Sequence, residues 1–241
     1  MARPASLSRS VRLFRAFLRE QSDPDHFYGV LAADSVGQLA SHVALDGATV
    51  LDVGGGPGYF ADAFRGAGAT YVGLEPDAGE LVARGEPEPG TLRASGEALP
   101  VRSGVVDVCY SSNVLEHVAS PWTMAAEMVR VTRPGGTVYL SFTPWLSPWG
   151  GHETAPWHYL GGSRARRRYR RQHGREPKNR FGESLFAVRA GAALRWARTC
   201  PDADLVAAYP RYHPWWAGWV IRLPGLRELI AWNLVLVLRR R

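Results

Sequence analysis

The stretch that decides the fold runs from Thr49 to Tyr59 and reads Thr-Val-Leu-Asp-Val-Gly-Gly-Gly-Pro-Gly-Tyr. Its first half is a short run of β-forming apolar residues, typical of a buried strand. Glycines at positions 54, 56 and 58 then let the backbone take positive φ and approach a ligand closely. We expect a helix over 59–65, whose N-terminal amides would face that ligand. This order indicates the carboxyl edge of a doubly wound sheet, where such folds bind nucleotides.

The spacing of the glycines excludes two common nucleotide motifs. The dinucleotide fingerprint G-x-G-x-x-G would need glycine at Tyr59, and no Lys-Ser or Lys-Thr pair follows the turn as a Walker motif requires. Asp52-x-Gly54-x-Gly56-x-Gly58 resembles instead motif I of the class I S-adenosylmethionine-dependent methyltransferases.

Further segments in the expected order strengthen this resemblance. Glu75 ends the next predicted strand about 20 residues after the glycines, the separation at which a carboxylate reaches a ribose diol. Gly96-Glu97-Ala98-Leu99-Pro100, Leu115-Glu116-His117-Val118 and Arg133-Pro134-Gly135-Gly136 are similar to segments of the same family. The resemblance covers roughly 46–142 and is to the methyltransferase 11 type.

The resemblance implies an α/β fold with a doubly wound, seven-stranded, mostly parallel Rossmann-like sheet. It also implies S-adenosylmethionine as methyl donor, with S-adenosylhomocysteine as product, and general class 2.1.1 chemistry. Glu97 and Ala98 would hold the adenine, and Ser112 and Asn113 would line the cleft beside the sulfonium. The full set of expected cofactor-binding residues is Asp52, Gly54, Gly55, Gly56, Gly58, Glu75, Pro76, Gly96, Glu97, Ala98, Ser112, Asn113 and Tyr28.

The rest of the chain is expected to complete a single methyltransferase domain of 1–241. N-terminal helices occupy 1–45, the cofactor-binding core 46–143, an insertion or acceptor lid 144–183, and the C-terminal part of the sheet 184–241. Helices are predicted over 6–20, 26–42, 122–131 and 184–200. Strands are predicted over 70–74, after the turn at 86–90, and over 105–110, 137–142, 203–209 and 233–239, the last antiparallel at a sheet edge.

Composition favours a cytoplasmic protein. The 241 residues are 46% hydrophobic, enough for one substantial core, and no apolar run is long enough to span a bilayer. The N-terminus has no uninterrupted apolar segment of the kind that a secretory signal needs. The two cysteines fit no metal spacing and no disulfide framework.

The insertion is predicted to bind the acceptor, because long irregular segments in compact domains are usually functional or disordered. It holds indole, imidazole and carboxylate groups close together, and its aromatic side chains could form the apolar walls of a pocket. The expected substrate-binding residues are Trp145, Trp149, Glu153, Trp157 and Tyr159, and the expected catalytic residues are His152, His158 and His117.

Glu116 and His117 have alternative interpretations. The pair could act as a general base or bind a divalent ion. Asn113 stands three residues earlier, where some quinone methyltransferases have a further glutamate for a metal. Because two candidate ligands are too few to enclose a metal ion, no metal site is predicted. We prefer the interpretation that this pair begins a helix and orders the cleft.

Basic residues are unevenly spread along a chain of net charge +7. Residues 163–180 hold nine cations against Glu176 alone. Such a run could bind phosphates or anionic headgroups, or it could form a solvated or mobile loop. The helix predicted over 6–20 alternates arginines with apolar residues. We expect it to pack on the domain or over the cofactor cleft, with a place on a membrane surface as the alternative. The tryptophans of 212–219 are expected to be buried, with lining of the acceptor cavity or a place at a membrane interface as the alternatives.

We therefore predict a methyltransferase acting on a small-molecule or lipid or glycolipid acceptor, with peripheral contact to anionic membrane as a hypothesis. Two alternatives remain: an RNA methyltransferase or RNA-binding protein using the 163–180 run, and a non-catalytic cofactor-binding relative. Nucleic acid is not favoured, because the basic run lies in one insertion. No obligate protein partner is predicted.

Overall fold

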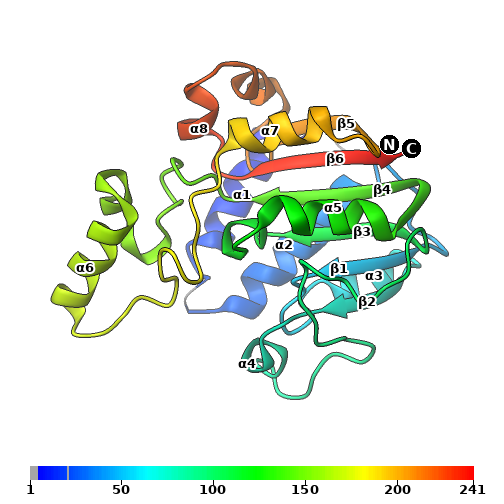
Figure 1. Cartoon of the computed structure of the whole chain (residues 1–241), viewed down its shortest axis with the longest axis horizontal. Helices are drawn as coiled ribbons and strands as arrows, with labels where there is room; N and C mark the ends of the chain where they lie inside the picture. Colours follow the sequence, from blue (N-terminus) through cyan, green and yellow to red (C-terminus); the bar gives the residue numbers. More distant parts are fainter. Residues whose placement is uncertain (1–4, 21) are drawn as a thin grey trace.

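The computed structural model describes residues 5–20 and 22–241 and contains one mixed sheet. The strand order is β2-β1-β3-β4-β6-β5 (Figure 1). The strands are β1 (Thr49–Val53), β2 (Thr70–Leu74), β3 (Val106–Ser112), β4 (Thr132–Phe142), β5 (Ala203–Pro210) and β6 (Leu234–Arg240). The first four run parallel, and β6 is antiparallel to both β4 and β5. The predicted α/β class and mostly parallel doubly wound sheet are confirmed.

Two details of the predicted sheet are wrong. Among the described residues there are six strands and not seven, because the strand expected after the turn at 86–90 is reduced to an isolated bridge between Leu74 and Leu92. Pro89-Gly90 and Ser95-Gly96 leave only four residues between two breaks. The final strand is antiparallel as predicted, but it lies between β4 and β5 and not at an edge. Its continuous burial from Leu234 to Leu238 fits that interior place.

Helices cover both faces of the sheet (Figure 1). They are α1 (Leu7–Phe17), α2 (Pro24–Leu39), α3 (Ala61–Gly66), α4 (Ala78–Leu81), α5 (Pro121–Val131), α6 (Gly162–His173), α7 (Ala190–Thr199) and α8 (Leu226–Ile230). Short 3-10 turns are η1 (Leu115–His117), η2 (His152–Thr154), η3 (Trp157–Leu160) and η4 (Trp215–Arg222). The side chains of Ser6 and Asp23 cap α1 and α2.

Alternate residues of each strand point to opposite faces of the sheet, and each face packs against its own hydrophobic core. Because both faces are buried, the strands are nearly continuous apolar runs. On one face Met124 and Leu194, from α5 and α7, share a core with Val138 of β4. On the other face Leu31 of α2 and Phe64 of α3 share a core with the strands. The sheet is thus the middle layer of three.

The helix predicted over 184–200 begins later, at Ala190. The residues before it run across the sheet edge, where the Phe186 amide donates to the Glu116 carbonyl at 2.8 Å. Glu228 accepts from the amides of Ala190 and Gly191 at 2.9 and 2.7 Å, which fixes the helix start there. Tertiary contacts therefore override the local helical pattern.

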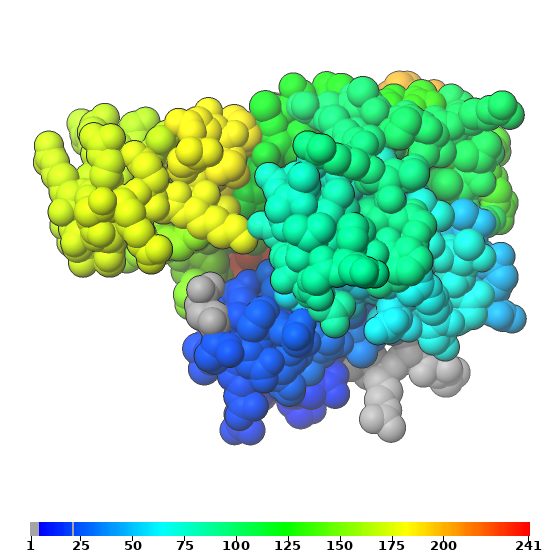
Figure 2. All heavy atoms as spheres, turned by 90° about the horizontal axis from the view of Figure 1, so that it is seen from below, coloured from blue at the N-terminus to red at the C-terminus, as the bar shows by residue number. Residues whose placement is uncertain are grey.

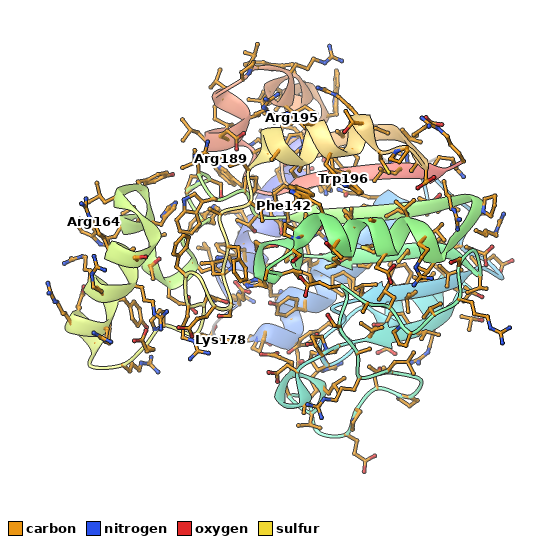
Figure 3. The ribbon with its side chains drawn as sticks, in the orientation of Figure 1. Phe142, Arg164, Lys178, Arg189, Arg195 and Trp196 are labelled. Atoms are coloured by element: carbon orange, nitrogen blue, oxygen red, sulfur yellow. The ribbon has the colours of Figure 1, made fainter. Side chains whose placement is uncertain are left out.

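Within the insertion at 144–183, helix α6 stands out from the body, as Figures 1 and 2 both show. Much of the arginine run forms the ordered helix α6, so the alternative of a mobile loop is wrong for 162–173. Arg166 pairs with Glu176 and Glu183 at 2.7 Å each, and Arg164 points into solvent (Figure 3). In the described part of the chain, no helix combines the length and apolar character needed to cross a membrane.

Candidate functional site

The carboxyl ends of three neighbouring strands bring the expected cofactor residues together. The glycine turn follows β1, Glu75 follows β2, and Ser112 ends β3. Because β1 pairs with β2 on one side and β3 on the other, these residues flank the turn. From β1 the chain continues to β2 on one side of the sheet and later to β3 on the other, so the strand order reverses here. Open α/β sheets bind ligands at such a switch point.

The glycine turn has the backbone that its sequence predicts. Gly54, Gly56 and Gly58 have φ of 78°, 52° and 83°. A Cβ on Gly54 would collide with the Val114 side chain, and one on Gly55 would lie 2.9 Å from the Tyr71 hydroxyl. A Cβ on Gly56 would meet nothing within 4 Å. Gly56 therefore faces open space that a side chain would fill, so the turn fits a ligand held against its backbone.

Glu75 is largely buried and oriented by backbone donors. Its Oε2 accepts from the Gly56 amide at 3.2 Å and its Oε1 from the Asp77 amide at 3.0 Å. Burial raises the pKa of Glu75, and the two amides act against that shift. Each carboxylate oxygen keeps a second lone pair, so the group can also accept from a diol. Pro76 beside it is exposed.

The buried side chain of Asp52 packs against the glycine turn at Gly55. It is 1% exposed and accepts from the Tyr71 hydroxyl at 2.9 Å. Burial raises the pKa of Asp52 to about 7, and the hydrogen bond from Tyr71 only partly offsets this. The structure thus places Asp52 beneath the turn and not along its open side.

The segment expected beside adenine makes internal contacts. Glu97 accepts from the Ser120 amide at 2.7 Å at the start of α5, and the Ala98 amide donates to the Ser95 carbonyl at 3.2 Å. Gly96 packs closely beneath, where a Cβ would lie 3.0 Å from Val53. These contacts therefore hold the loop at 95–98 beside the end of β1.

The end of β3 is fixed by an arginine that the sequence did not single out. Arg211 is fully buried, and its Nη1 donates to Ser112 Oγ at 2.8 Å and to Asn113 Oδ1 at 3.4 Å. Asn113 has φ of 58°, and its Oδ1 also accepts from Asn233 at 2.7 Å. The only local signal was that this arginine lies two residues after the end of the strand predicted over 203–209.

Tyr28 lies beside the residue that follows the turn. Its ring stacks on Tyr59 with centroids 4.4 Å apart, and its hydroxyl donates to Glu20 at 3.0 Å. The helix α2 therefore carries an aromatic side chain to the residue that follows Gly58.

The expected acceptor residues do not converge on one pocket. Trp145 is buried against Phe181, and Trp149 packs edge-on against Phe17 of α1 at 5.0 Å. Glu153 and Trp157 line a cavity of about 150 Å³ against α6, and Tyr159 is exposed.

The three predicted catalytic histidines also separate. His158 is 1% exposed, and its Nε2 bonds the Ser147 carbonyl at 3.1 Å. Burial lowers the pKa of His158. His117 and His152 lie together instead, with ring centroids 5.0 Å apart, beside the buried Glu116. A structural role suits His158, whereas the other two form a polar cluster between β3 and the insertion.

Comparison with known proteins agrees with this geometry. The family model described as a methyltransferase domain matches residues 51–140. A protein of Mycolicibacterium gilvum, named an uncharacterized methyltransferase, is 56% identical and aligns over 99% of this chain and 97% of its own. A protein of the same description from Mycobacteroides abscessus is 55% identical over 100% of this chain and 97% of its own.

Solved structures show the same fold at low identity. An S-adenosylmethionine-dependent methyltransferase from Mesorhizobium loti is similar with a TM-score of 0.58 and 18% identity, covering 86% of this chain and 98% of that one. The geranyl diphosphate C-methyltransferase of Streptomyces coelicolor gives 0.55 and 14%, covering 86% and 77%.

Asp52 should make stability depend on pH. Its pKa is raised to about 7 in the folded state, so between about pH 4 and that value the folded protein retains a proton that the unfolded chain releases. The free energy of unfolding should therefore fall as pH rises through this window, by up to about 1.4 kcal/mol per unit, relative to Asp52→Asn. Urea denaturation at several pH values measures this free energy of unfolding. The exposed Asp202→Asn serves as control, and equal slopes for the wild type and Asp52→Asn would refute the assignment.

Filling the space above Gly56 should block the donor. Gly56→Asn should raise the donor dissociation constant at least about tenfold, about 1.4 kcal/mol, because asparagine tolerates positive φ and its side chain would occupy the ligand's place. Gly47→Asn is the matched control, since Gly47 has φ of 71° and equally open surroundings. Glu75→Ala should also weaken binding. If calorimetry gave unaltered donor dissociation constants for both Gly56→Asn and Glu75→Ala, the assignment of this site would be wrong.

Proposed function

The chain belongs to the class I S-adenosylmethionine-dependent methyltransferases, and from that premise we propose which residues hold the donor and what acceptor the enzyme serves. S-adenosylmethionine is the cofactor, and when bound it supplies a methyl group on a sulfonium. Direct transfer of that group requires mainly alignment of the two reactants. The chain's own contribution is therefore to bind the two reactants, to orient them, and to exclude water from the site.

The donor-binding residues we propose surround the end of β1. The backbone of Gly54, Gly56 and Gly58 receives the donor, and Glu75 accepts from its ribose hydroxyls. Ser112 and Asn113, held by Arg211, border the methyl group. The open space at Gly56 is the observation that carries this assignment.

The acceptor we propose is an amphiphile with an apolar body and an anionic or polar head, such as a membrane lipid or glycolipid. The support is an exposed surface of apolar side chains around α1 and η4. Trp215, Trp216 and Trp219 are 69, 57 and 52% exposed, so the expectation that these tryptophans are buried is wrong. Exposed tryptophans beside arginines suit a membrane–water interface.

The helix α1 contributes the other half of this surface. Leu7 and Leu18 are more than half exposed, and the Trp215 amide donates to the Ala5 carbonyl at 2.7 Å, which joins η4 to the start of α1. A groove of about 690 Å³ beside α1 is lined by apolar and basic residues, among them Leu7, Val11, Val30, Arg12, Arg15 and Arg19. That combination suits an acyl chain below an anionic head.

The alternative of RNA as substrate has less support. Arg166 and Arg170 share Glu176, and Arg168 lies over the Trp157 ring at 4.0 Å, so part of the run has partners within the insertion. We keep the amphiphile as the proposal.

Binding to anionic vesicles tests the membrane part. Replacing Arg12, Arg15 and Arg19 by Gln should reduce partitioning by up to about hundredfold, since each cation near such a surface contributes about 1 kcal/mol. Added salt should also weaken binding. The matched control is Arg164, Arg167 and Arg171→Gln on α6, away from the groove residues. Equal binding by the wild type and the α1 variant at low salt would remove the membrane claim.

The acceptor side should be separable from the donor side. His152→Ala should reduce methyl transfer to lipid extracts more than tenfold while donor affinity changes less than about twofold. His158→Ala should instead lower the melting temperature, because its imidazole fills a buried place. If His152→Ala abolished donor binding in a folded protein, this division would be wrong.

A further inference from the structure

Three side chains with metal-binding atoms meet between the core and the insertion. Glu116 and His117 lie in η1, directly after β3, and His152 begins η2. One ligand atom from each lies within 4.8 Å of the others. No hydrogen bond joins these side chains to one another in the part of the chain that the structure describes.

Glu116 has a buried oxygen with no partner. The residue is 1% exposed, and its Oε1 accepts from the Thr143 amide at 2.9 Å. Its Oε2 is buried and has no hydrogen-bond partner among the described residues. Leaving a carboxylate oxygen unsatisfied in a protein interior is costly, and a bound cation would satisfy it.

Both imidazoles are oriented as metal ligands usually are. His117 Nδ1 donates to the Ser184 carbonyl at 2.7 Å, and His152 Nδ1 faces the Gly150 carbonyl at 3.4 Å. These bonds place the proton on Nδ1 and leave the Nε2 lone pair free in each ring. His152 also has φ of 47°, a conformation that non-glycine residues rarely adopt and that often marks functional sites.

We propose that Glu116, His117 and His152 bind one divalent transition-metal ion of the zinc type. Two imidazoles and a carboxylate favour Zn²⁺ over Mg²⁺ or Ca²⁺, which prefer oxygen ligands. Three protein ligands leave a fourth position open, to water or to an oxygen of the acceptor. This departs from the prediction of no metal, because His152 supplies the ligand that Asn113 could not. The site stands independently of the acceptor's identity.

Calorimetry on the chelator-treated full chain tests the proposal, with ZnCl₂ as the probe. We expect one equivalent to bind, and Co²⁺ to give a visible absorption spectrum typical of bound imidazole. Glu116→Gln and His152→Ala should each weaken Zn²⁺ binding at least about tenfold. His173→Ala, at an exposed imidazole on α6, should leave it unchanged.

The outcome that overturns the proposal is zinc affinity equal to wild type in both Glu116→Gln and His152→Ala, or wild-type binding that is lost in His173→Ala. Circular dichroism confirms that each variant is folded, and Glu116→Gln preserves shape if His152→Ala does not fold. Donor affinity, measured in the same samples, separates a failed metal site from a failed methyltransferase assignment.

Discussion

A buried guanidinium group holds the carboxyl edge of the sheet together. Arg211 is fully buried, and none of the described carboxylates lies within 4 Å of its nitrogens. A charge in such a place is tolerated only where hydrogen bonds replace its water. Its acceptors come from α2, β3, β4 and the residue after β3: Ser35, Tyr110, Ser112, Asn113 and Ser141. Each is thereby fixed relative to the others.

This constraint extends to both functional regions. Toward the proposed donor site it sets Asn113 in a left-handed backbone beside the glycine turn. Toward the opposite side, the Arg211 carbonyl accepts from Arg9 at 3.0 Å, and Arg9 pairs with Asp34 of α2 at 2.6 Å. The ion pair holds α1 against α2, and the hydrogen bond from the Trp215 amide to the Ala5 carbonyl joins η4 to the start of α1. One buried arginine thus links the carboxyl edge of the sheet to the surface that we propose meets lipid.

The insertion shows why composition alone does not reveal which of its aromatic residues serve packing. Trp145, His158 and Phe181 form a small core of their own, with Trp145 and His158 5.2 Å apart. A protruding segment needs such a core to remain ordered, so some of its indole and imidazole groups serve packing. That core in turn positions η2, which brings His152 to His117. An irregular segment has no periodicity from which side-chain direction can be inferred, so the sequence could not distinguish His152 from His158.

The sequence by itself determined the elements whose causes are local. The apolar strand, the three glycines with positive φ and the carboxylate at Glu75 follow from conformational preferences within a few residues, and they sufficed for the fold and the cofactor. Tertiary structure decided the rest: the interior place of β6, the loss of a seventh strand, the burial of Arg211 and the meeting of Glu116 with His152. These depend on which distant elements pack together, and pairing and burial are properties of that packing and not of any short stretch of chain.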